Sequence, residues 1–315
     1  MIVVLGAFDG FHLGHRLLLD RAAELASENG CSDDWGVVTF SPHPGSVVKN
    51  REIPVLFTES ERDILARYLG IPRTIKIPFT PELASASPDE FLVLLETLVR
   101  VSGIVVGKDF RFGRDRGGDT GYLRSVSRSK NWLFSEVEPL FIDGEKVGSS
   151  SIRSHVAHGE IRTARKLMGY PFFFEGEVVP GAGRGRKLGF PTANVHYPAE
   201  KVMPRRGVYV ASVLVDSQWL PGALNVGINP TFVPEEVRVR AETHIIGYNG
   251  TLYNRRILVF LEQFLRDEEK FDSAAALAEQ MKADVERARD IFESLRMQGC
   301  DVYERLAGVL EKQEM

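Results

Sequence analysis

The chain has 315 residues, enough for two domains that each bury a hydrophobic core of ordinary size. Its 39 Lys and Arg against 43 Asp and Glu give a formal net charge of -4, so the composition indicates neither a nucleic-acid partner nor an anionic membrane surface. The 2 cysteines have no metal-binding spacing, and no apolar stretch approaches the ~20 residues of a membrane span. We expect a cytosolic protein, and the composition leaves a homo-oligomer open without indicating one.

The first half of the chain alternates β-branched runs with helical patterns. One predicted helix has a well-defined start, because Ser87 can cap it, Pro88 begins its first turn and Glu90 completes a capping box. A β-α-β alternation of this kind predicts a parallel, doubly wound, Rossmann-like sheet. Strands are predicted at 2–5, 35–40, 73–78 and 103–106, and helices near 16–27, 59–69 and 88–100.

The pattern changes after Met168, where Gly169-Tyr170-Pro171 predicts the end of a helix and Phe172 begins a new strand. We therefore predict two domains, residues 1–170 and 171–315. The second contains short strands with turn residues between them, which predicts a small antiparallel barrel or sandwich. Its strands are predicted at 206–215, 219–227, 238–246 and 252–264, with a tight hairpin at 249–250, a long amphipathic helix at 273–295 and a short helix within 299–315.

A glycine-rich turn lies where the first strand meets the first helix, and it reads Gly6-Ala7-Phe8-Asp9-Gly10-Phe11-His12-Leu13-Gly14-His15. Open α/β sheets bind ligands beyond the carboxyl ends of their strands, and a helix start offers free N–H groups to a phosphate. The glycines let the backbone approach that phosphate, and His12 and His15 could donate to oxygens that gain charge during displacement at phosphorus. An isolated histidine would more often be a cap or an interior residue, but the cluster favours nucleotidyl transfer.

A second glycine-rich stretch runs from Gly181 to Asn194. Its alternate glycines allow backbone N–H groups to converge on an anion, and Arg184, Arg186 and Lys187 add positive charge, although a solvated basic loop is an alternative. Thr192 and Asn194 follow on one side of an extended chain and offer oxygen atoms to Mg²⁺. The stretch therefore predicts a site for magnesium and a nucleotide.

A kinase also needs a group that orients or deprotonates the attacking hydroxyl. Glu242, in a run of strand-forming residues, is the candidate for this general base. A carboxylate on a strand is usually a solvent-facing residue, so position alone does not establish the role.

Together these motifs resemble the bacterial bifunctional riboflavin kinase/FMN adenylyltransferase (FAD synthetase) family. The N-terminal resemblance implies that His12 and His15 bind the ATP phosphates within the turn that contains Gly6, Phe8, Asp9 and Gly10. It also implies that Ser150 and Arg153 clamp the phosphates from a facing helix start, and that Asp109 and Arg111 belong to the flavin side. Where the family usually reads Ser-Ser-Thr-Arg-Ile-Arg, this chain has Gly148-Ser149-Ser150-Ser151-Ile152-Arg153 and lacks one arginine. The stretches that carry this resemblance are 6–15, 39–44, 105–113 and 148–153.

The C-terminal resemblance implies a six-stranded antiparallel β-barrel with a C-terminal helix. By the same resemblance Thr192 and Asn194 bind Mg-ATP, and Glu242 activates the 5′-hydroxyl of riboflavin. Gly181, Gly185, Lys187 and Asn225 complete the implied ligand-binding set. The stretches that carry the resemblance are 189–194, 207–209, 225–231, 242–245, 252–253 and 270–273.

The expected reactions consume ATP with Mg²⁺ at two different phosphorus atoms. The kinase moves the γ-phosphoryl group to riboflavin, whereas the adenylyltransferase lets FMN attack the α-phosphorus, which gives FAD and pyrophosphate. Two ATP sites are therefore expected, one per domain. Two alternatives remain open at this point: a flavin-binding or regulatory protein with one silent domain, and a class I aminoacyl-tRNA synthetase-like enzyme, which also carries an H-x-G-H turn.

Overall fold

The computed structural model describes residues 1–181, 183–229, 238–297 and 301–311, which fall into two units. The first unit comprises Met1–Val55 and Leu65–Ser151, and the second comprises Leu56–Ile64 and Ile152–Met315. The predicted functional boundary after residue 170 stays a prediction. Three predicted features lie outside the described residues: Ala182 of the glycine-rich stretch, residues 230–231 of a quoted motif, and residues 299–300 and 312–315 of the C-terminal segment.

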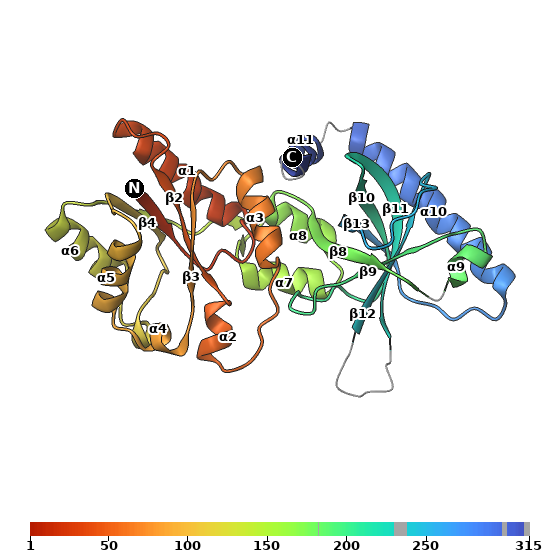
Figure 1. Ribbon diagram of the computed structural model, residues 1–315, viewed down its shortest axis with the longest axis horizontal. Helices are drawn as coiled ribbons and strands as arrows, with labels where there is room; N and C mark the ends of the chain where they lie inside the picture. The colour runs from red at the N-terminus through yellow and green to blue at the C-terminus, as the bar shows by residue number, and fades with distance from the viewer. Residues whose placement is uncertain (182, 230–237, 298–300, 312–315) are drawn as a thin grey trace. The chain divides into compact units, whose positions relative to one another are not determined.

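Five parallel strands form the sheet of the first unit, in the order β3-β2-β1-β4-β5 (Figure 1). The chain runs outward from β1 to β3 and then returns to pair β4 with the other side of β1, so the order reverses between β1 and β4. The Rossmann-like prediction is confirmed, and this reversal is the place where open α/β sheets bind ligands. The strands are β1 (Ile2–Leu5), β2 (Trp35–Ser41), β3 (Thr74–Pro78), β4 (Gly103–Gly107) and β5 (Leu133–Val137).

Helices cover this sheet through apolar contacts. Phe91 and Leu95 of α5 and Leu123 of α6 share a buried cluster with Val3 of β1 and Val106 of β4. The capping box predicted for α5 is confirmed by the bonds from the Glu90 N–H to Ser87 Oγ (3.2 Å) and from the Ser87 N–H to Glu90 Oε2 (2.7 Å). The helices and short strands of this part of the chain are α1 (Leu13–Glu28), α2 (Pro44–Val48), α3 (Glu59–Tyr68), α4 (Pro81–Ser85), α5 (Pro88–Leu98), the 3-10 turn η1 (Arg114–Arg116), α6 (Thr120–Lys130), β6 (Phe141–Ile142), β7 (Glu145–Lys146) and α7 (Ser149–Ala157). Of these, α3 and α7 each have residues in both units.

Six antiparallel strands close into a barrel in the second unit, in the order β10-β11-β12-β9-β8-β13. Closure gives every strand two partners, which removes exposed sheet edges. The predicted six-stranded barrel is confirmed. Its strands are β8 (Phe172–Val179), β9 (Ala193–His196), β10 (Gly207–Val215), β11 (Gln218–Asn229), β12 (Arg238–Ile245) and β13 (Arg256–Arg266).

The tight hairpin predicted at Asn249-Gly250 is wrong. β12 pairs with β11 and β9, whereas β13 pairs with β10 and β8, so the strands on either side of this dipeptide are not neighbours. Positive φ occurs instead at Gly247 (84°) and Asn254 (62°), and β13 begins only at Arg256. A turn dipeptide reports local backbone freedom, but barrel closure decides which strands pair.

The helices of the second unit match the predictions more closely. α8 (Ile161–Met168) ends at Gly169 with φ 80°, as the helix end predicted there requires. The long predicted helix is α10 (Ala274–Met297), which packs on β10 and β11 with Ala288 and Val285 against Val210. The unit also contains α9 (Arg184–Lys187) and α11 (Asp301–Glu311).

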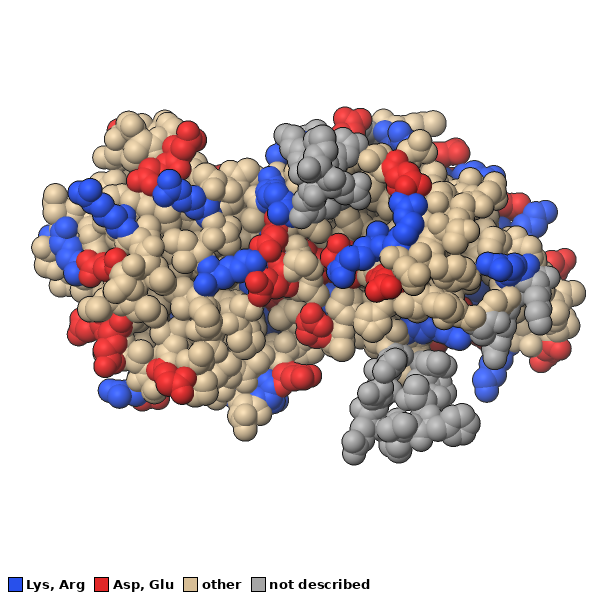
Figure 2. All heavy atoms as spheres, in the orientation of Figure 1, with Lys and Arg blue, Asp and Glu red and all other residues tan. Residues whose placement is uncertain are grey.

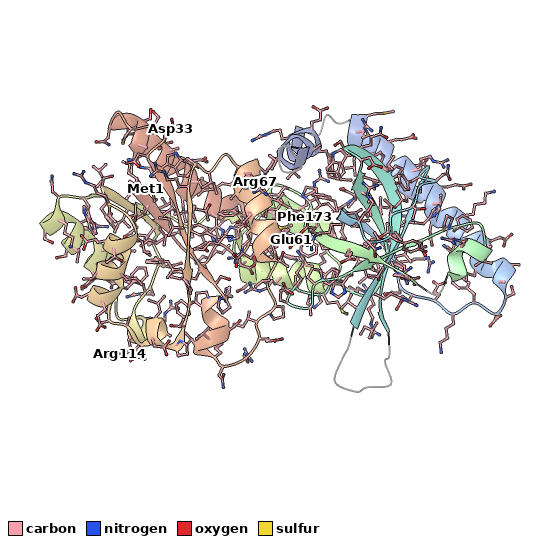
Figure 3. All side chains as sticks on the ribbon, viewed as in Figure 1. Met1, Asp33, Glu61, Arg67, Arg114 and Phe173 are labelled. Carbon is pink, nitrogen blue, oxygen red and sulfur yellow. The ribbon has the colours of Figure 1, made fainter. Side chains whose placement is uncertain are left out.

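A buried ion pair connects Leu56–Ile64 to the barrel within this unit. Lys201 Nζ lies 2.6 Å from Glu61 Oε2, and both side chains are 0% exposed. Lys201 also donates to the Phe173 carbonyl at 2.8 Å, while Glu61 accepts from the N–H groups of Thr58 and Glu175. Figure 3 labels Glu61 and Phe173 among the side chains. Both members of the pair therefore have further hydrogen-bond partners besides each other, which offsets part of the cost of burying the charges.

The surface in view carries both charge signs. Figure 2 shows Lys and Arg side chains interspersed with Asp and Glu over the described atoms of that face. Among the described residues, no helix is long and apolar enough to cross a membrane.

Candidate active sites

A pocket of about 260 Å³ lies at the carboxyl ends of the parallel strands, where their order reverses. Its walls come from the turn after β1, the segment after β4 and the segment after β5. The predicted turn thus meets residues more than ninety positions later in the chain. The lining includes Gly6, Phe8, His12, Gly14, His15, Lys108, Asp109, Phe110, Glu138 and Lys146.

The two predicted histidines lie against each other in this pocket. Their rings stack with centroids 3.6 Å apart and an interplanar angle of 15°. His12 is the N-cap of α1, and its Nδ1 accepts from the His15 N–H at 3.2 Å. His15 Nδ1 lies 2.7 Å from the carbonyl oxygen of Gly10. These bonds fix both rings before any ligand binds.

The same bonds determine what each neutral ring can offer. Because His12 Nδ1 accepts, its proton lies on Nε2, which can donate to a ligand. A carbonyl only accepts, so His15 must donate from Nδ1, and its neutral Nε2 can then only accept. Burial, reinforced by the charge of His15, lowers the pKa of His12 to about 2, and burial lowers the pKa of His15 to about 4. His12 is thus the neutral donor, and His15 donates to a phosphate only after taking up a proton.

Space as well as flexibility favours glycine in this turn. A Cβ at Gly14 would lie 3.3 Å from the His12 ring and 3.4 Å from the Val147 carbonyl oxygen. Gly10 has φ 76°, a conformation that residues with a Cβ rarely adopt. Because these positions have no side chain, the backbone of the turn can come close to a phosphate.

The start of α7 reaches the same turn. Ser149 Oγ donates to the carbonyl oxygen of Asp9 at 3.0 Å, so the helix start that carries Ser150 lies beside the glycine-rich turn. Ser150 is exposed. Arg153 lies further along α7, in the part assigned to the other unit, and its contact with a nucleotide stays a prediction.

The two residues predicted on the flavin side, Asp109 and Arg111, differ in their contacts. Asp109 lines the pocket and forms an ion pair with Lys146 of β7, whereas Arg111 pairs with Asp119, the N-cap of α6, at 2.9 Å. Sequence reasoning missed Lys146 because nothing in its local pattern distinguishes it from a surface lysine.

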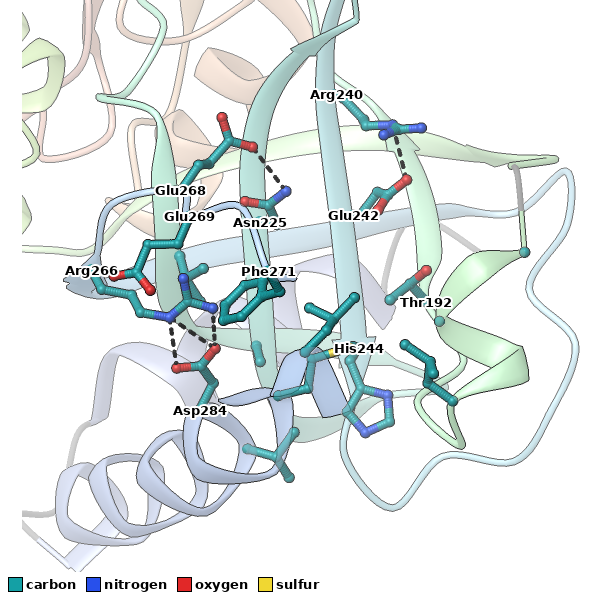
Figure 4. A pocket seen from close by; sticks show the side chains of 18 residues that line it. Thr192, Asn225, Arg240, Glu242, His244, Arg266, Glu268, Glu269, Phe271 and Asp284 are labelled. Carbon is teal, nitrogen blue, oxygen red and sulfur yellow. Dashed lines mark hydrogen bonds and ion pairs between the residues drawn. The ribbon is translucent and has the colours of Figure 1, made fainter. Parts of the chain in front are cut away.

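The second pocket, about 240 Å³, lies in the barrel unit between the outer face of the strands and α10 (Figure 4). It brings together predicted residues that are far apart in sequence. Thr192, Asn225 and Glu242 all line it, together with Gly183, Gly185, Arg240, His244, Arg266, Glu268, Glu269, Phe271 and Asp284.

Strand register places Glu242 in the middle of this site. It pairs with Asn225 on β11 and with Asn194 on β9, so three predicted site residues form one row across three strands. Asn225 donates from Nδ2 to Glu268 Oε1 at 3.2 Å, and its buried Oδ1 has no hydrogen-bond partner in the described part of the chain. That oxygen is an acceptor available to a substrate donor.

The glycine-rich stretch folds against the same row. A Cβ at Gly181 would lie 2.0 Å from Asn194 Nδ2, and one at Gly185 would lie 2.3 Å from the Phe190 carbonyl oxygen. These close approaches exclude larger residues, because any side chain there would displace Asn194 or the backbone. Lys187 lies in α9, but its side chain is outside the described set.

The donor set fits magnesium. Thr192 lines the pocket beside Gly185, and Asn194 lies against Gly181, so both provide neutral oxygen atoms next to the glycine-rich stretch. Mg²⁺ prefers oxygen ligands and uses few from the protein when phosphates supply the others.

Sequence reasoning missed several charged residues of the barrel pocket. Arg266 on β13 holds Asp284 on α10, with Nη2 2.7 Å from Oδ2, and this pair attaches the helix to the pocket wall. Arg240 forms an ion pair with Glu242, with Nε 2.9 Å from Oε1. The i, i+2 spacing of Arg240 and Glu242 on one strand was the signal that could have found this contact.

Comparisons with known proteins match both halves of the chain. A family model described as FAD synthetase matches residues 1–151, and one described as riboflavin kinase matches residues 168–292. The bifunctional riboflavin kinase/FMN adenylyltransferase of Pseudomonas fluorescens is 35% identical over 290 residues, 91% of this chain and 92% of its own length. The protein of the same description from Bacillus subtilis (strain 168) is 32% identical over 300 residues, 94% of this chain and 93% of its own.

A solved structure shares the fold. It is described as a macrolide-efflux protein from Streptococcus pneumoniae, and it aligns with a TM-score of 0.84 at 30% identity over 91% of this chain and 93% of its own. Its description concerns that protein, whereas both family models and the full-length relatives agree on the two activities. The chain therefore belongs to the family of bifunctional riboflavin kinases/FMN adenylyltransferases, with the adenylyltransferase in its N-terminal half and the kinase in its C-terminal half.

Proposed function

We propose that Glu242, Thr192 and Asn194 carry out the phosphorylation of riboflavin in the barrel pocket, and that His12 and His15 stabilise adenylyl transfer to FMN in the sheet pocket. The observation that carries the kinase proposal is the row Asn194, Glu242 and Asn225 across three paired strands. It supplies a base between neutral amides beside the glycine cradle.

In the kinase reaction, the oxygen of the riboflavin 5′-hydroxyl bonds to the γ-phosphorus of ATP while Glu242 accepts the proton of that hydroxyl. The bond from that phosphorus to the β,γ-bridging oxygen breaks, and ADP leaves. The backbone around Gly181 and Gly185 holds the phosphates, and Lys187 adds positive charge to this loop. The Asn225 acceptor orients the bound substrate.

Thr192 and Asn194 would hold Mg²⁺ through the hydroxyl and the amide oxygen. When bound, the ion neutralises charge on the transferring phosphates. The two side chains fix where that charge is neutralised, because Asn194 lies in register with Glu242.

In the adenylyltransferase reaction, a phosphate oxygen of FMN attacks the α-phosphorus of ATP, and pyrophosphate leaves. The His12 Nε2–H donates to an oxygen that gains charge in this step, and His15 donates after protonation. Gly6, Phe8, Asp9 and Gly10 shape the turn around the phosphates. Ser150 binds the phosphates from the start of α7, and Asp109 and Arg111 belong to the FMN side.

The product mixture tests both assignments in one tube. We expect the purified chain with riboflavin, ATP and Mg²⁺ to give FMN first and FAD later, resolved by chromatography. FMN that accumulates without FAD would contradict the sheet-pocket assignment, and FMN supplied directly tests that half alone.

Neither family model, nor any relative named above, is described as an aminoacyl-tRNA synthetase, so that alternative has no support in these matches. A flavin-binding or regulatory protein with one silent domain would keep ligand affinity in variants that lose catalysis. The cytosolic location and the oligomeric state stay predictions.

A further inference from the structure

Arg240 is the charged neighbour of the proposed base. It lies two residues before Glu242 on β12, on the same face of the strand, and both side chains line the barrel pocket. Its Nε lies 2.9 Å from Glu242 Oε1, with the two side chains 32% and 23% exposed (Figure 4). The pair is thus half-buried in the pocket wall.

The surroundings of Glu242 make this contact distinctive. Its neighbours across the strands, Asn225 and Asn194, are amides and carry no charge. The other arginine of the pocket, Arg266, is committed to Asp284. Within the part of the chain that the structure describes, the ion pair recorded for Glu242 is the one with Arg240.

The residue opposite Arg240 is a glycine. Arg240 pairs with Gly227 on β11, and a Cβ at Gly227 would lie 2.6 Å from Glu268 Oε1. The Glu268 carboxylate therefore occupies the space over Gly227, beside the position that Arg240 takes across from it. Glu268 accepts from Asn225 Nδ2 at 3.2 Å, whereas Arg240 donates to Glu242, the proposed base.

We infer that Arg240 is a positioning residue for riboflavin phosphorylation, an inference that rests on the proposed function of Glu242. A glutamate has three side-chain torsions, and a carboxylate that samples several rotamers meets the hydroxyl in a reactive geometry only part of the time. Donation from Nε to Oε1 restricts those torsions and leaves Oε2 to accept the proton of the substrate. The residue acts through Glu242, without contact to the reacting atoms.

An ion pair at this exposure contributes little to folding stability, because water screens it. A positioning role can therefore be distinguished from a structural role. Loss of a positioning residue lowers kcat, whereas loss of a structural residue lowers the free energy of unfolding. Arg256 provides a matched control, since it forms a similar ion pair with Glu175 at 2.6 Å in the same barrel but does not line the pocket.

The test uses the full chain with Arg240→Gln, Arg240→Lys and Arg256→Gln, assayed for both reactions. We expect Arg240→Gln to lower kcat for riboflavin phosphorylation by roughly 10-fold to 100-fold, with KM for ATP changed less than about 2-fold. Arg240→Lys should recover part of the loss, because it keeps a charged donor. Arg256→Gln should keep full kinase activity, and all three should convert added FMN to FAD at the normal rate.

Specific results would overturn the inference. An unchanged kcat in Arg240→Gln would do so, and so would a raised KM for ATP at normal kcat, which would make Arg240 a phosphate ligand. Should Arg240→Gln fail to fold, the same kcat criterion applies to Arg240→Lys. Glu242→Gln shows whether the inference about Arg240 or the proposed function of Glu242 has failed. If Glu242→Gln keeps kinase activity, the assignment of Glu242 as the base is wrong. If Glu242→Gln is inactive while Arg240→Gln is unaffected, only the positioning role of Arg240 is wrong. If the inference holds, Arg240→Gln combined with Glu242→Gln should phosphorylate riboflavin no more slowly than Glu242→Gln alone.

Discussion

The two pockets are built from opposite kinds of sequence information. Ten consecutive residues, 6–15, provide the centre of the sheet pocket. Among them His12 is the N-cap of α1, and His15 lies in the first turn of that helix. The barrel pocket takes Asn225 and Glu242 from two paired strands, β11 and β12, and Thr192 from the position just before a third strand, β9, so the residues meet only in the fold. A local motif can therefore be found by reading along the chain, whereas a site assembled by strand pairing needs the fold.

Both pockets contain ion pairs, but their proposed catalytic groups differ in charge. The sheet pocket keeps two stacked imidazoles neutral by burial, beside the ion pair of Asp109 and Lys146. In the barrel pocket the proposed base, Glu242, is itself paired with Arg240. A variant that removes a group from one pocket should therefore affect only the reaction of that pocket.

The largest expected effect is the loss of the base in the barrel pocket. Glu242→Gln keeps the size of the side chain but cannot accept the hydroxyl proton, so we expect kcat for riboflavin phosphorylation to fall by roughly 10² to 10⁴. Conversion of added FMN to FAD is the internal control and should be unchanged. Equal loss of both reactions would mean that the two pockets do not work separately.

A large effect on stability is expected from the buried pair of the barrel unit. Lys201→Met leaves the Glu61 carboxylate buried without its cation, which should lower the free energy of unfolding by about 3 to 5 kcal/mol. Denaturant unfolding measures this change. Glu61→Gln added to Lys201→Met removes the stranded charge and should restore much of the loss, and no recovery would show that the charge was not the cause.

The sheet pocket provides the matching catalytic variant. In His12→Asn, a residue that caps helices well replaces the imidazole, so α1 keeps its cap while the Nε2–H donor is lost. We expect kcat for FAD formation to fall by roughly 10² to 10³, with riboflavin phosphorylation unchanged. Normal FAD formation would remove His12 from the reaction.

Acid should weaken the sheet unit through the same histidines. In the folded state the pKa of His12 is about 2 and that of His15 about 4, against about 6.5 when unfolded. Between pH 6.5 and 4 the unfolded state binds more protons, so the stability present above pH 6.5 is lost on acidification, at most roughly 1.4 kcal/mol per pH unit for each histidine. Thermal unfolding of the sheet unit at pH 7.5, 6.0 and 5.0 measures this slope. His12→Asn should show a smaller slope, and a slope of the opposite sign would contradict the assignment of neutral buried rings.

The smallest effect is expected where the sequence alone predicted the contact. Ser87→Ala removes the side-chain acceptor that caps α5 and should cost about 1 kcal/mol of unfolding free energy, while both reactions continue normally. Ser87→Thr is the control and should cost less. A loss of activity in Ser87→Ala would mean that α5 contributes to a site.

Local signals explain which features could be predicted. The capping box at Ser87 and the helix end at Gly169 each depend on a few neighbouring residues, and both are confirmed. The hairpin at Asn249-Gly250 is wrong because the closed barrel, and not the dipeptide, determines the partners of β12 and β13.

The same limit applies to the sites. The glycine-rich turn with His12 and His15 was visible as a motif, but Lys146 reached the pocket only through the small β6–β7 pair. Arg240 was overlooked because a single arginine on a strand is typical of a solvent-facing residue. Its meaning comes from the bond to Glu242, which needs side-chain positions.

The most direct measurement is the number of nucleotides that one chain binds. Calorimetric titration with a non-hydrolysable ATP analogue and Mg²⁺ should give two bound molecules per chain. His12→Asn or a bulky residue at Gly181 should each weaken only one of the two. A stoichiometry of one, or the loss of both binding events from a single variant, would contradict the account of two separate sites.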